Sequence, residues 1–435
     1  MSDCGSVIDM NGDGSMNVYE QTKQALARAE ELGGKNGLNC IAELDSTALE
    51  QAKELDAKSD AGVSGFWGTP VLIKDNIDVK GLHTTAGSLA LEDNIAVEDA
   101  PVIRNLRKNG AVILGKTNMT EFANYTTNGM PGGYSSRGGQ VIHAVNPSLS
   151  PSGSSSGSAV AVAAGIVPAA VGTDTSFSII ACAQENGICG LKPPVGVLSS
   201  DGIIPIAKTL DSAGAMARNF SDALRLYSAM REEPLPELQA ADIATLRIAV
   251  NTANRKMISP GQNKFRRRAV RQLKRNGARI SKIEQMPTPF QGVIMKYEFK
   301  AHLEEYLGTS AASRKTLQEI VEYYETNPET MMKYGYTLLK AALDETPGGL
   351  QGTEYLNAME ERSKMMVSVR EALADYDAVI ITGPTNIMHF CGLPSVTIAG
   401  SQTNKYGVRR GLMLYGVDEY RLYRAALAIE KIIGD

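Results

Sequence analysis

Residues 148–163 read SLSPSGSSSGSAVAVA, and the interpretation of the whole fold depends on this segment. Its first eleven residues have the composition of a flexible linker, because glycine and serine bury little apolar surface and are readily solvated. A linker would separate two self-contained α/β patterns, whereas the alternation of strands and helices continues across this one. The linker interpretation therefore fails, and the glycines and serines need another explanation.

Strand and helix patterns lie on both sides of the segment. TPVLIK (69–74) predicts a short apolar strand that ends at Lys74, and APVIRNLRKNG (100–110) with AVILGK (111–116) predicts a helix, a glycine stop and a strand. The apolar run 159–170 predicts a helix directly after the serines. A membrane span needs about 20 residues, so this run is expected to be buried in the protein.

The remaining elements are expected toward the two ends of the chain. The periodicity predicts two helices within 16–60, a strand at 246–250, a helix at 263–277, a helical block to about 345, a strand at 377–382 and a helix at about 418–433. The helix at 263–277 carries arginines opposite an apolar face, which is typical of a solvated surface rather than of a polyanion site.

The composition is that of a globular protein. Of the 435 residues 43% are hydrophobic and 21% are charged, and the net charge of −4 gives no support to a nucleic-acid partner. The first residues do not show a basic region followed by an apolar core, so neither a signal peptide nor membrane attachment is expected. Five cysteines without a C-x-x-C pair favour reduced thiols and a cytoplasmic location.

One motif has the spacing of a calcium site. DMNGDGSMNVYE (Asp9–Glu20) satisfies the EF-hand loop pattern, with Asp9, Asn11 and Asp13 as oxygen ligands and Gly14 at the sharp turn. An EF-hand also needs an entering helix, and only eight residues precede Asp9. Because such clusters commonly form turns and helix caps, we favour a helix start over a bound metal.

A second motif has the spacing of an α/β-hydrolase nucleophile. GSSSG (153–157) matches G-x-S-x-G, with Ser155 as the nucleophile and His389 as the histidine of a triad. That turn must follow a hydrophobic strand, and VNPSLSPS precedes it, which cannot form a central strand. We therefore expect His389 to be a packed histidine.

Lys74 suggests a third chemistry. A lysine that an apolar strand delivers into the interior is costly unless it is neutral or paired, and burial lowers its pKa toward the working range of a base. A neutral amine can take the proton of a serine, which then attacks a carbonyl carbon. Serines are available in GSSSGS (153–158) and GTDTSFS (172–178). Taken alone, a lysine after a strand is more often structural than catalytic. The residues around Lys74 therefore decide between these two roles.

Those surroundings resemble the amidase signature family over almost the whole chain. The matching segments, in the family's order and spacing, are GTPVLIKDNID (68–78), HTTAGS (83–88), GAVILGKTNMTEFAN (110–124), SRGGQ (136–140), SPSGSSSGSAVAVAAG (150–165), GTDTSFSI (172–179), NGICGLKPPVG (186–196), DGIIPI (201–206) and CGLPSVTIAG (391–400). YEFKAHLEEYL (297–307) and TLQEIVEYYETNP (316–328) are more similar to peptide amidases and related acylamidases than to the tRNA-dependent amidotransferase subunit.

The resemblance implies a Ser–cis-Ser–Lys triad. By position, Lys74 would be the base, Ser154 the bridging serine after a cis peptide bond, and Ser178, 24 residues later, the nucleophile that forms an acyl-enzyme. Ser155 resembles the neighbouring serine that helps to hold the lysine. The Gly/Ser run would then be folded tightly against Lys74, since small residues allow close approach.

The family's oxyanion hole maps to backbone N–H groups of residues 175–178. Thr175, Ser176 and Phe177 precede the nucleophile, and Phe177 stands where the family has glycine. Glycine allows the substrate to approach the backbone and permits unusual φ values. We expect the benzyl group to narrow the pocket or shift the oxyanion hole, which leaves altered specificity, slow turnover and binding without catalysis as alternatives.

The resemblance also implies an architecture. It predicts one amidase domain over 1–435 with a mixed, largely parallel sheet flanked by helices: N-terminal helices at about 16–60, the signature core at about 65–230, a helical substrate-pocket segment at about 285–345, and a C-terminal strand and helix. The short segment after ITGPT (381–385) predicts a reduced C-terminal region and a more open pocket. The expected activity is hydrolysis of a small-molecule or peptide amide without metal or organic cofactor. The alternatives are a catalytically impaired binding protein and an amidotransferase-type subunit, and a homodimer is left open.

Overall fold

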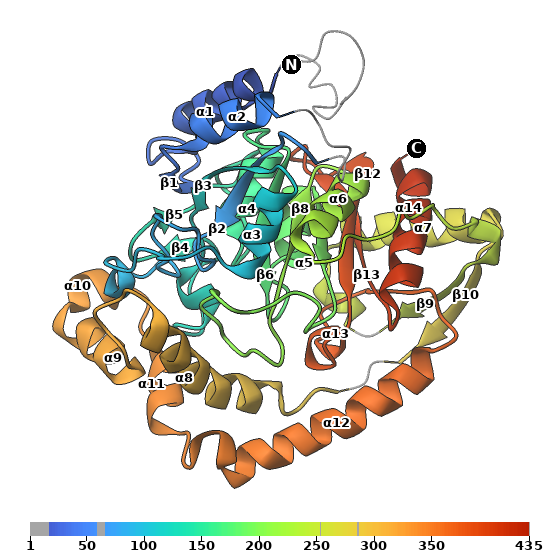
Figure 1. The fold of residues 1–435 in the computed structure, drawn as a ribbon. Helices are drawn as coiled ribbons and strands as arrows, with labels where there is room; N and C mark the ends of the chain where they lie inside the picture. The colour runs from blue at the N-terminus through green and yellow to red at the C-terminus, as the bar shows by residue number, and fades with distance from the viewer. Residues whose placement is uncertain (1–16, 59–65, 253, 285–286, 435) are drawn as a thin grey trace.

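The structure, a computed structural model, describes residues 17–58, 66–252, 254–284 and 287–434. Within these ranges eleven strands form one sheet and two short strands form a hairpin (Figure 1). In spatial order the sheet strands are β1 (Ile41–Leu44), β3 (Val112–Thr117), β2 (Pro70–Lys74), β6 (Ala169–Asp174), β8 (Ser212–Ala217), β7 (Cys189–Lys192), β12 (Ser395–Thr403), β13 (Arg409–Tyr415), β11 (Ala378–Ile380), β9 (Arg247–Asn251) and β10 (Arg279–Ile283). The hairpin pairs β4 (Tyr134–Ser135) with β5 (Gly139–Gln140).

The sheet is mixed, with its parallel pairs gathered in two blocks. Strands β3, β2 and β6 are parallel to one another, as are β11, β9 and β10. Between these blocks, β8, β7, β12 and β13 pair antiparallel with each other and with the block edges, and β1 pairs antiparallel with β3 at one end. Parallel neighbours need a long crossover connection between their strands. The antiparallel neighbours β12 and β13 are instead joined by a short turn.

Helices cover both faces of the sheet (Figure 1). The helices are α1 (Val18–Gly33), α2 (Ala48–Asp56), α3 (Pro101–Lys108), α4 (Ser156–Ala163), α5 (Ile180–Asn186), α6 (Phe220–Met230), α7 (Pro260–Arg275), α8 (Gln291–Thr309), α9 (Leu317–Thr326), α10 (Pro328–Met331), α11 (Thr337–Asp344), α12 (Thr353–Leu373), α13 (Ile387–Phe390) and α14 (Glu419–Gly434). One buried apolar cluster includes residues of α4, α5 and α8–α12, and a second includes residues of α3, α6, α7 and α14. The expected α/β architecture with flanking helices is confirmed.

The prediction for the apolar run 159–170 is only half right. Helix α4 ends at Ala163, Gly165 turns the chain with a φ of 71°, and the run continues into strand β6. Alanine and valine are compatible with both structures, and the left-handed glycine marks where the helix stops. The run is buried over most of its length, as expected.

Helices α8–α11 occupy the segment that was predicted to be helical. Figure 1 shows them at one side of the molecule, with α12 running from beside them back toward strands β9 and β10. None of the helices in the described ranges combines the length and apolarity needed to cross a membrane.

Candidate active site

Strand β2 delivers Lys74 into the protein interior. All five residues of the strand are buried, and the Lys74 side chain has no exposed surface. Its Nζ donates to Ser154 Oγ at 2.7 Å, to Thr173 Oγ1 at 2.7 Å and to the Thr173 carbonyl oxygen at 3.2 Å. Lys74 and Ser154 are thus in direct contact although 80 residues separate them.

Burial changes the acidity of Lys74. Removal from water disfavours the charged form and lowers the pKa of the Lys74 ammonium to about 7, although Cys182, Asp174 and Asp211 act in the opposite direction. Near neutral pH the amine can therefore lose and regain a proton readily. That behaviour is required of a general base.

Two further buried lysines have different surroundings. Lys116 donates to the carbonyl oxygens of Ile77 and His83 and lies 3.7 Å from the Asp75 carboxylate. Lys192 donates to the carbonyl oxygens of Pro193 and Leu393. Neither ammonium contacts a serine hydroxyl, so among these three lysines only Lys74 has a serine partner that it could deprotonate.

The Gly/Ser segment packs tightly around Ser154. The Gly153–Ser154 peptide bond is cis, as the family resemblance implied. A Cβ on Gly153 would lie 2.4 Å from Thr120 Oγ1, and a Cβ on Gly157 would lie 2.3 Å from the Asn118 carbonyl oxygen. The glycines are needed for close contact rather than for flexibility.

Ser155 is linked to Lys74 through Thr173. Its hydroxyl donates to the Thr173 carbonyl oxygen at 3.0 Å and accepts from the Thr173 N–H at 3.3 Å. Thr173 in turn contacts Lys74, and the Asn76 amide donates to Thr173 Oγ1 at 3.1 Å. Thr173 lies within GTDTSFS (172–178), but no role was predicted for it from the sequence. The sequence carried no signal for this role, because it depends on the pairing of β6 with β2.

Ser178 lies between strand β6 and helix α5, next to the serine segment. Its carbonyl oxygen accepts from the Ser155 N–H at 3.3 Å, and 6% of the residue is exposed. Asp174 Oδ2 accepts from the N–H groups of Ile179 and Ile180 at the start of α5, which fixes the loop on either side of Ser178.

Phe177 adopts a backbone conformation that normally favours glycine. Its φ is 70°, which costs a non-glycine residue about 1–3 kcal/mol and persists only where neighbours enforce it. His389 is such a neighbour, because its Nε2 accepts from the Phe177 N–H at 3.1 Å and its ring packs against the Phe177 ring with centroids 4.6 Å apart. The loop therefore has a backbone conformation suited to glycine although phenylalanine stands there.

His389 is fully buried, as expected, but it does not contact Ser155. Burial lowers the pKa of His389 to about 4, so the ring is neutral at pH 7. Since Nε2 accepts the Phe177 N–H, the ring proton is on Nδ1, which lies 3.2 Å from Asp174 Oδ1. Ser155 is instead bonded to Thr173, so the hydrolase arrangement of Ser155 with His389 is not formed.

The N–H groups of the oxyanion loop are not equivalent. The Phe177 N–H is engaged by His389, whereas no hydrogen bond in the described part of the chain uses those of Thr175, Ser176 or Ser178. The side chains of this loop are held by other partners: Thr175 Oγ1 donates to Asp211, and Ser176 Oγ donates to Asn386 Oδ1 at 3.1 Å. The N–H groups at 175, 176 and 178 therefore have no hydrogen-bond partner among the described residues.

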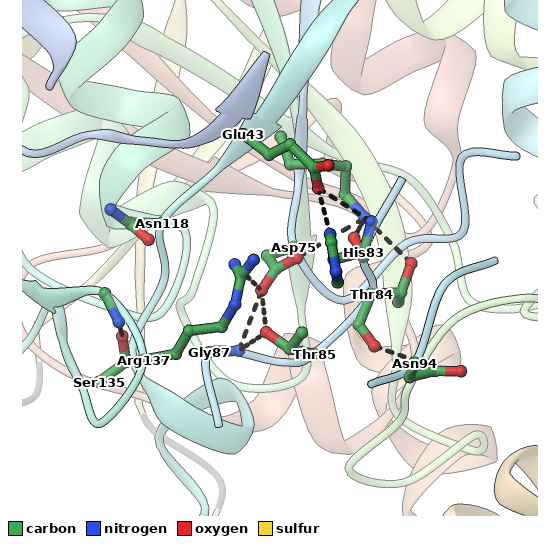
Figure 2. A network of polar contacts seen from close by, with 12 residues as sticks. Glu43, Asp75, His83, Thr84, Thr85, Gly87, Asn94, Asn118, Ser135 and Arg137 are labelled. Carbon is green, nitrogen blue, oxygen red and sulfur yellow. Dashed lines mark hydrogen bonds and ion pairs between the residues drawn. The ribbon is translucent and has the colours of Figure 1, made fainter. Parts of the chain in front are cut away.

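A polar network anchors the turn that follows Lys74 (Figure 2). The Asp75 carboxylate accepts from Thr85 Oγ1 and, at 3.2 Å, from the Gly87 N–H, and it lies 3.8 Å from the Arg137 guanidinium. Figure 2 also shows His83 beside Glu43, with 2.9 Å between Nδ1 and Oε2. Sequence reasoning did not identify this network, whose members come from distant segments.

The predicted calcium ligands Asp9, Asn11 and Asp13, with Gly14, lie outside the described residues. Glu20 lies in the first turn of α1, where Asn17 caps the helix by accepting from the Glu20 N–H. Across the described residues, no three His, Cys, Asp or Glu side chains come together in a way that could hold a metal ion.

Known proteins resemble this chain in sequence and in structure. Residues 20–403 match the family described as amidase. A probable amidase of Arabidopsis thaliana is 29% identical over 427 residues, 91% of this chain and 83% of that protein. One subunit of the glutamyl-tRNA(Gln) amidotransferase from Exiguobacterium sibiricum is 29% identical over 470 residues, 97% of this chain and 95% of that protein. Native peptide amidase of Stenotrophomonas maltophilia has a TM-score of 0.88 at 31% identity, covering 96% of this chain and 94% of that one.

Proposed function

The chain belongs to the amidase family and is an amide-hydrolysing enzyme, and we propose that it acts through Lys74, Ser154 and Ser178. The observation that carries this proposal is the 2.7 Å contact between Lys74 Nζ and Ser154 Oγ in a fully buried setting. Burial lowers the pKa of Lys74 to about 7, which suits a base at neutral pH.

The proton would move in two steps. Neutral Lys74 accepts the proton of Ser154 as Ser154 accepts that of Ser178, and Ser178 Oγ attacks the amide carbonyl carbon. The C–N bond then breaks, and the leaving amine takes the relayed proton. Water hydrolyses the resulting ester, which releases the carboxylic acid and restores Ser178.

Backbone donors would stabilise the negative charge that develops on the carbonyl oxygen. The N–H groups of Thr175, Ser176 and Ser178 are free to do so, and each such donor is worth roughly 3–4 kcal/mol in comparable sites. The Phe177 N–H would have to leave His389 before it could join them. We therefore assign the oxyanion hole to the other three groups, with Phe177 and Ser155 as residues that shape and hold the site.

We propose a carboxylic amide of a small molecule or a peptide as the substrate. The similarity to peptide amidase supports a peptide C-terminal amide, and the sequence resemblance to acylamidases leaves an aryl amide as the alternative. The Phe177 ring would restrict the size of the group that enters next to the nucleophile.

Active-site labelling tests the assignment of Ser178. A fluorophosphonate probe should modify Ser178, as identified by mass spectrometry of the digested protein, and labelling should fail in Lys74→Ala. Ser155→Ala is the matched control, because Ser155 directly follows Ser154 but its hydroxyl is bonded to Thr173, and the variant should still be labelled at Ser178. Labelling at Ser155 of the wild type would contradict the proposal.

One alternative function follows from Phe177. If its ring blocks the approach of the substrate carbonyl, the chain would bind amides without hydrolysing them. A second alternative is glutamine hydrolysis within an amidotransferase, which is supported by the similarity to the Exiguobacterium sibiricum protein over 97% of this chain.

A further inference from the structure

A cavity of about 430 Å³ lies against Phe177 and helix α5. It is bounded by α5, strand β13, the first turns of α7 and the short connection 381–386 between β11 and α13. The loop and helix side chains that line it are Phe177, Ala181, Gln184 and Glu185, which recur at helical spacing on one face. Ser178 is not among the lining residues, so its hydroxyl is not part of the cavity wall.

The walls combine an apolar surface with an excess of positive charge. Phe177, Ile381, Leu412 and Met413 form part of the apolar lining. Three arginines, Arg266, Arg409 and Arg410, and one carboxylate, that of Glu185, line the cavity. Volumes of about 300–1,000 Å³ with a few polar groups are typical of small-molecule sites.

The three arginines are not equivalent. The guanidinium of Arg409 donates to the carbonyl oxygens of residues 218, 399 and 400, so its donors are already used within the protein. The Arg410 guanidinium makes no hydrogen bond or ion pair with any described residue, and the residue is half-buried. A Cβ on Gly261 would lie 2.5 Å from an Arg410 guanidinium nitrogen, so the missing side chain at Gly261 makes room for this cation beside the cavity.

We propose that this cavity is a second ligand site, for a small molecule with an apolar body and a single carboxylate. The carboxylate pairs with Arg410, because a planar guanidinium binds it through two parallel hydrogen bonds. The apolar body packs against Phe177 and Met413. Glu185 at the same cavity disfavours a ligand of higher negative charge, which distinguishes a monocarboxylate from a phosphate ester.

Calorimetric titration with 4-phenylbutanoate tests the site. The wild type and Ser178→Ala should bind it with dissociation constants that agree within about twofold, since the Ser178 hydroxyl is not part of the cavity wall. Arg410→Gln should bind at least about tenfold more weakly, because it loses a charge-assisted hydrogen-bonded pair. The neutral alcohol 4-phenylbutan-1-ol should bind the wild type at least about tenfold more weakly than 4-phenylbutanoate does.

Arg267→Gln is the matched control. Arg267 is exposed on the same helix, α7, but does not line the cavity, so this variant should bind like the wild type. Three results would each overturn the proposal: Arg410→Gln binds 4-phenylbutanoate as tightly as the wild type, Ser178→Ala does not bind it, or the wild type does not bind it. Because binding is measured without turnover, these outcomes are independent of whether the hydrolytic mechanism is correct; thermal midpoints show that the variants are folded.

Discussion

At the scale of single residues, the three buried lysines differ in what their nitrogens contact. Lys116 and Lys192 serve as donors to backbone carbonyl oxygens, and Lys116 also lies near a carboxylate. Such contacts stabilise the charged form and suit a structural role. Lys74 also donates to one carbonyl oxygen, that of Thr173, but it is the one of the three that contacts a serine hydroxyl, and it has no carboxylate within ion-pair distance among the described residues. Its contacts tolerate either protonation state, which suits a group that must cycle between them.

Removal of Lys74 should therefore abolish hydrolysis without unfolding the protein. We expect Lys74→Ala to lower kcat/KM by at least about a hundredfold, because a general base typically contributes 10²–10⁴-fold. Lys74→Arg is the informative control, since its guanidinium keeps the positive charge but stays protonated. Both variants should be inactive if the amine acts as a base. Activity in Lys74→Arg near that of the wild type would mean that only the charge matters.

The pH dependence of hydrolysis should follow the same group. Burial lowers the pKa of Lys74 to about 7, and the base works only when deprotonated. The value of kcat/KM should therefore rise with pH and level off above about 7–8. The Asp211 carboxyl is the control, because burial raises its pKa to about 7 as well. The ascending limb should persist in Asp211→Asn, and a flat profile between about pH 6 and 8.5 would contradict the role of Lys74.

Substitution of Phe177 should distinguish an enzyme from a binding protein. The loop already has the glycine conformation, so Phe177→Gly should preserve the backbone while removing the ring. We expect wild-type turnover of small amides, and about a 10–100-fold gain on bulkier aromatic amides in the variant, the range that pocket contacts typically provide. Phe177→Leu retains bulk and should not show this gain. A wild type that binds amides but turns over none, and a Phe177→Gly variant that becomes active, would support the binding-protein alternative instead.

At the scale of elements, the position of helix α4 depends on a glycine. The Gly157 N–H donates to the Asn118 carbonyl oxygen at 2.9 Å, and the carbonyl oxygen of Cys40, just before β1, also lies close to Gly157. This contact holds the first turn of α4 against the segment that follows β3. Because Ser154 lies just before this turn, the docking of α4 also sets the distance between Ser154 and Lys74.

Two glycine-to-alanine changes in helices should therefore act in opposite directions. A Cβ on Gly157 would lie within 2.3–2.5 Å of two backbone carbonyl oxygens, which cannot move independently of the chain. Gly157→Ala should lower the free energy of unfolding by about 1–3 kcal/mol and reduce activity. Gly308→Ala in α8 meets no atom within 4 Å and should leave stability unchanged or raise it by up to about 1 kcal/mol. Urea denaturation checks both, and equal effects would contradict the packing argument.

The elements themselves were predictable to different degrees. Helices α1, α3 and α7 and strands β2 and β3 were predicted because their apolar periodicity is local. The antiparallel strands at the centre of the sheet were not, because their pairing depends on contacts between segments far apart in sequence. The apolar run after the serines was assigned wholly to a helix because alanine and valine fit either structure.

The residues of the candidate site were also predictable to different degrees. Lys74, Ser154 and Ser178 were selected because they lie in motifs that resemble the amidase signature. The role of Thr173 and the bond between the Phe177 N–H and His389 could not be foreseen, since they join residues 99 and 212 positions apart through side-chain geometry. The more open pocket expected from the short segment after ITGPT (381–385) stays a prediction.

At the scale of the whole molecule, the proposed site is made by one chain. Its groups come from β2, the start of α4, the end of β6 and the loop before α5, all within residues 70–180. The apolar clusters on the two sides of the sheet bury this region, and Lys74 and Ser154 have no exposed surface. The geometry that joins Lys74 to Ser154 therefore requires no residue from another chain.

The purified chain should consequently hydrolyse amides on its own. We expect release of ammonia or amine from small carboxylic amides without any added protein, and none from Ser178→Ala. Specific activity should stay constant over about a hundredfold dilution, because dilution dissociates complexes but leaves a one-chain site intact. The similarity to an amidotransferase component makes this measurement decisive. Activity confined to glutamine, or activity that appears only when further proteins are added, would assign the chain to a transferase assembly. A loss of specific activity on dilution would show that a second copy of the chain contributes to catalysis.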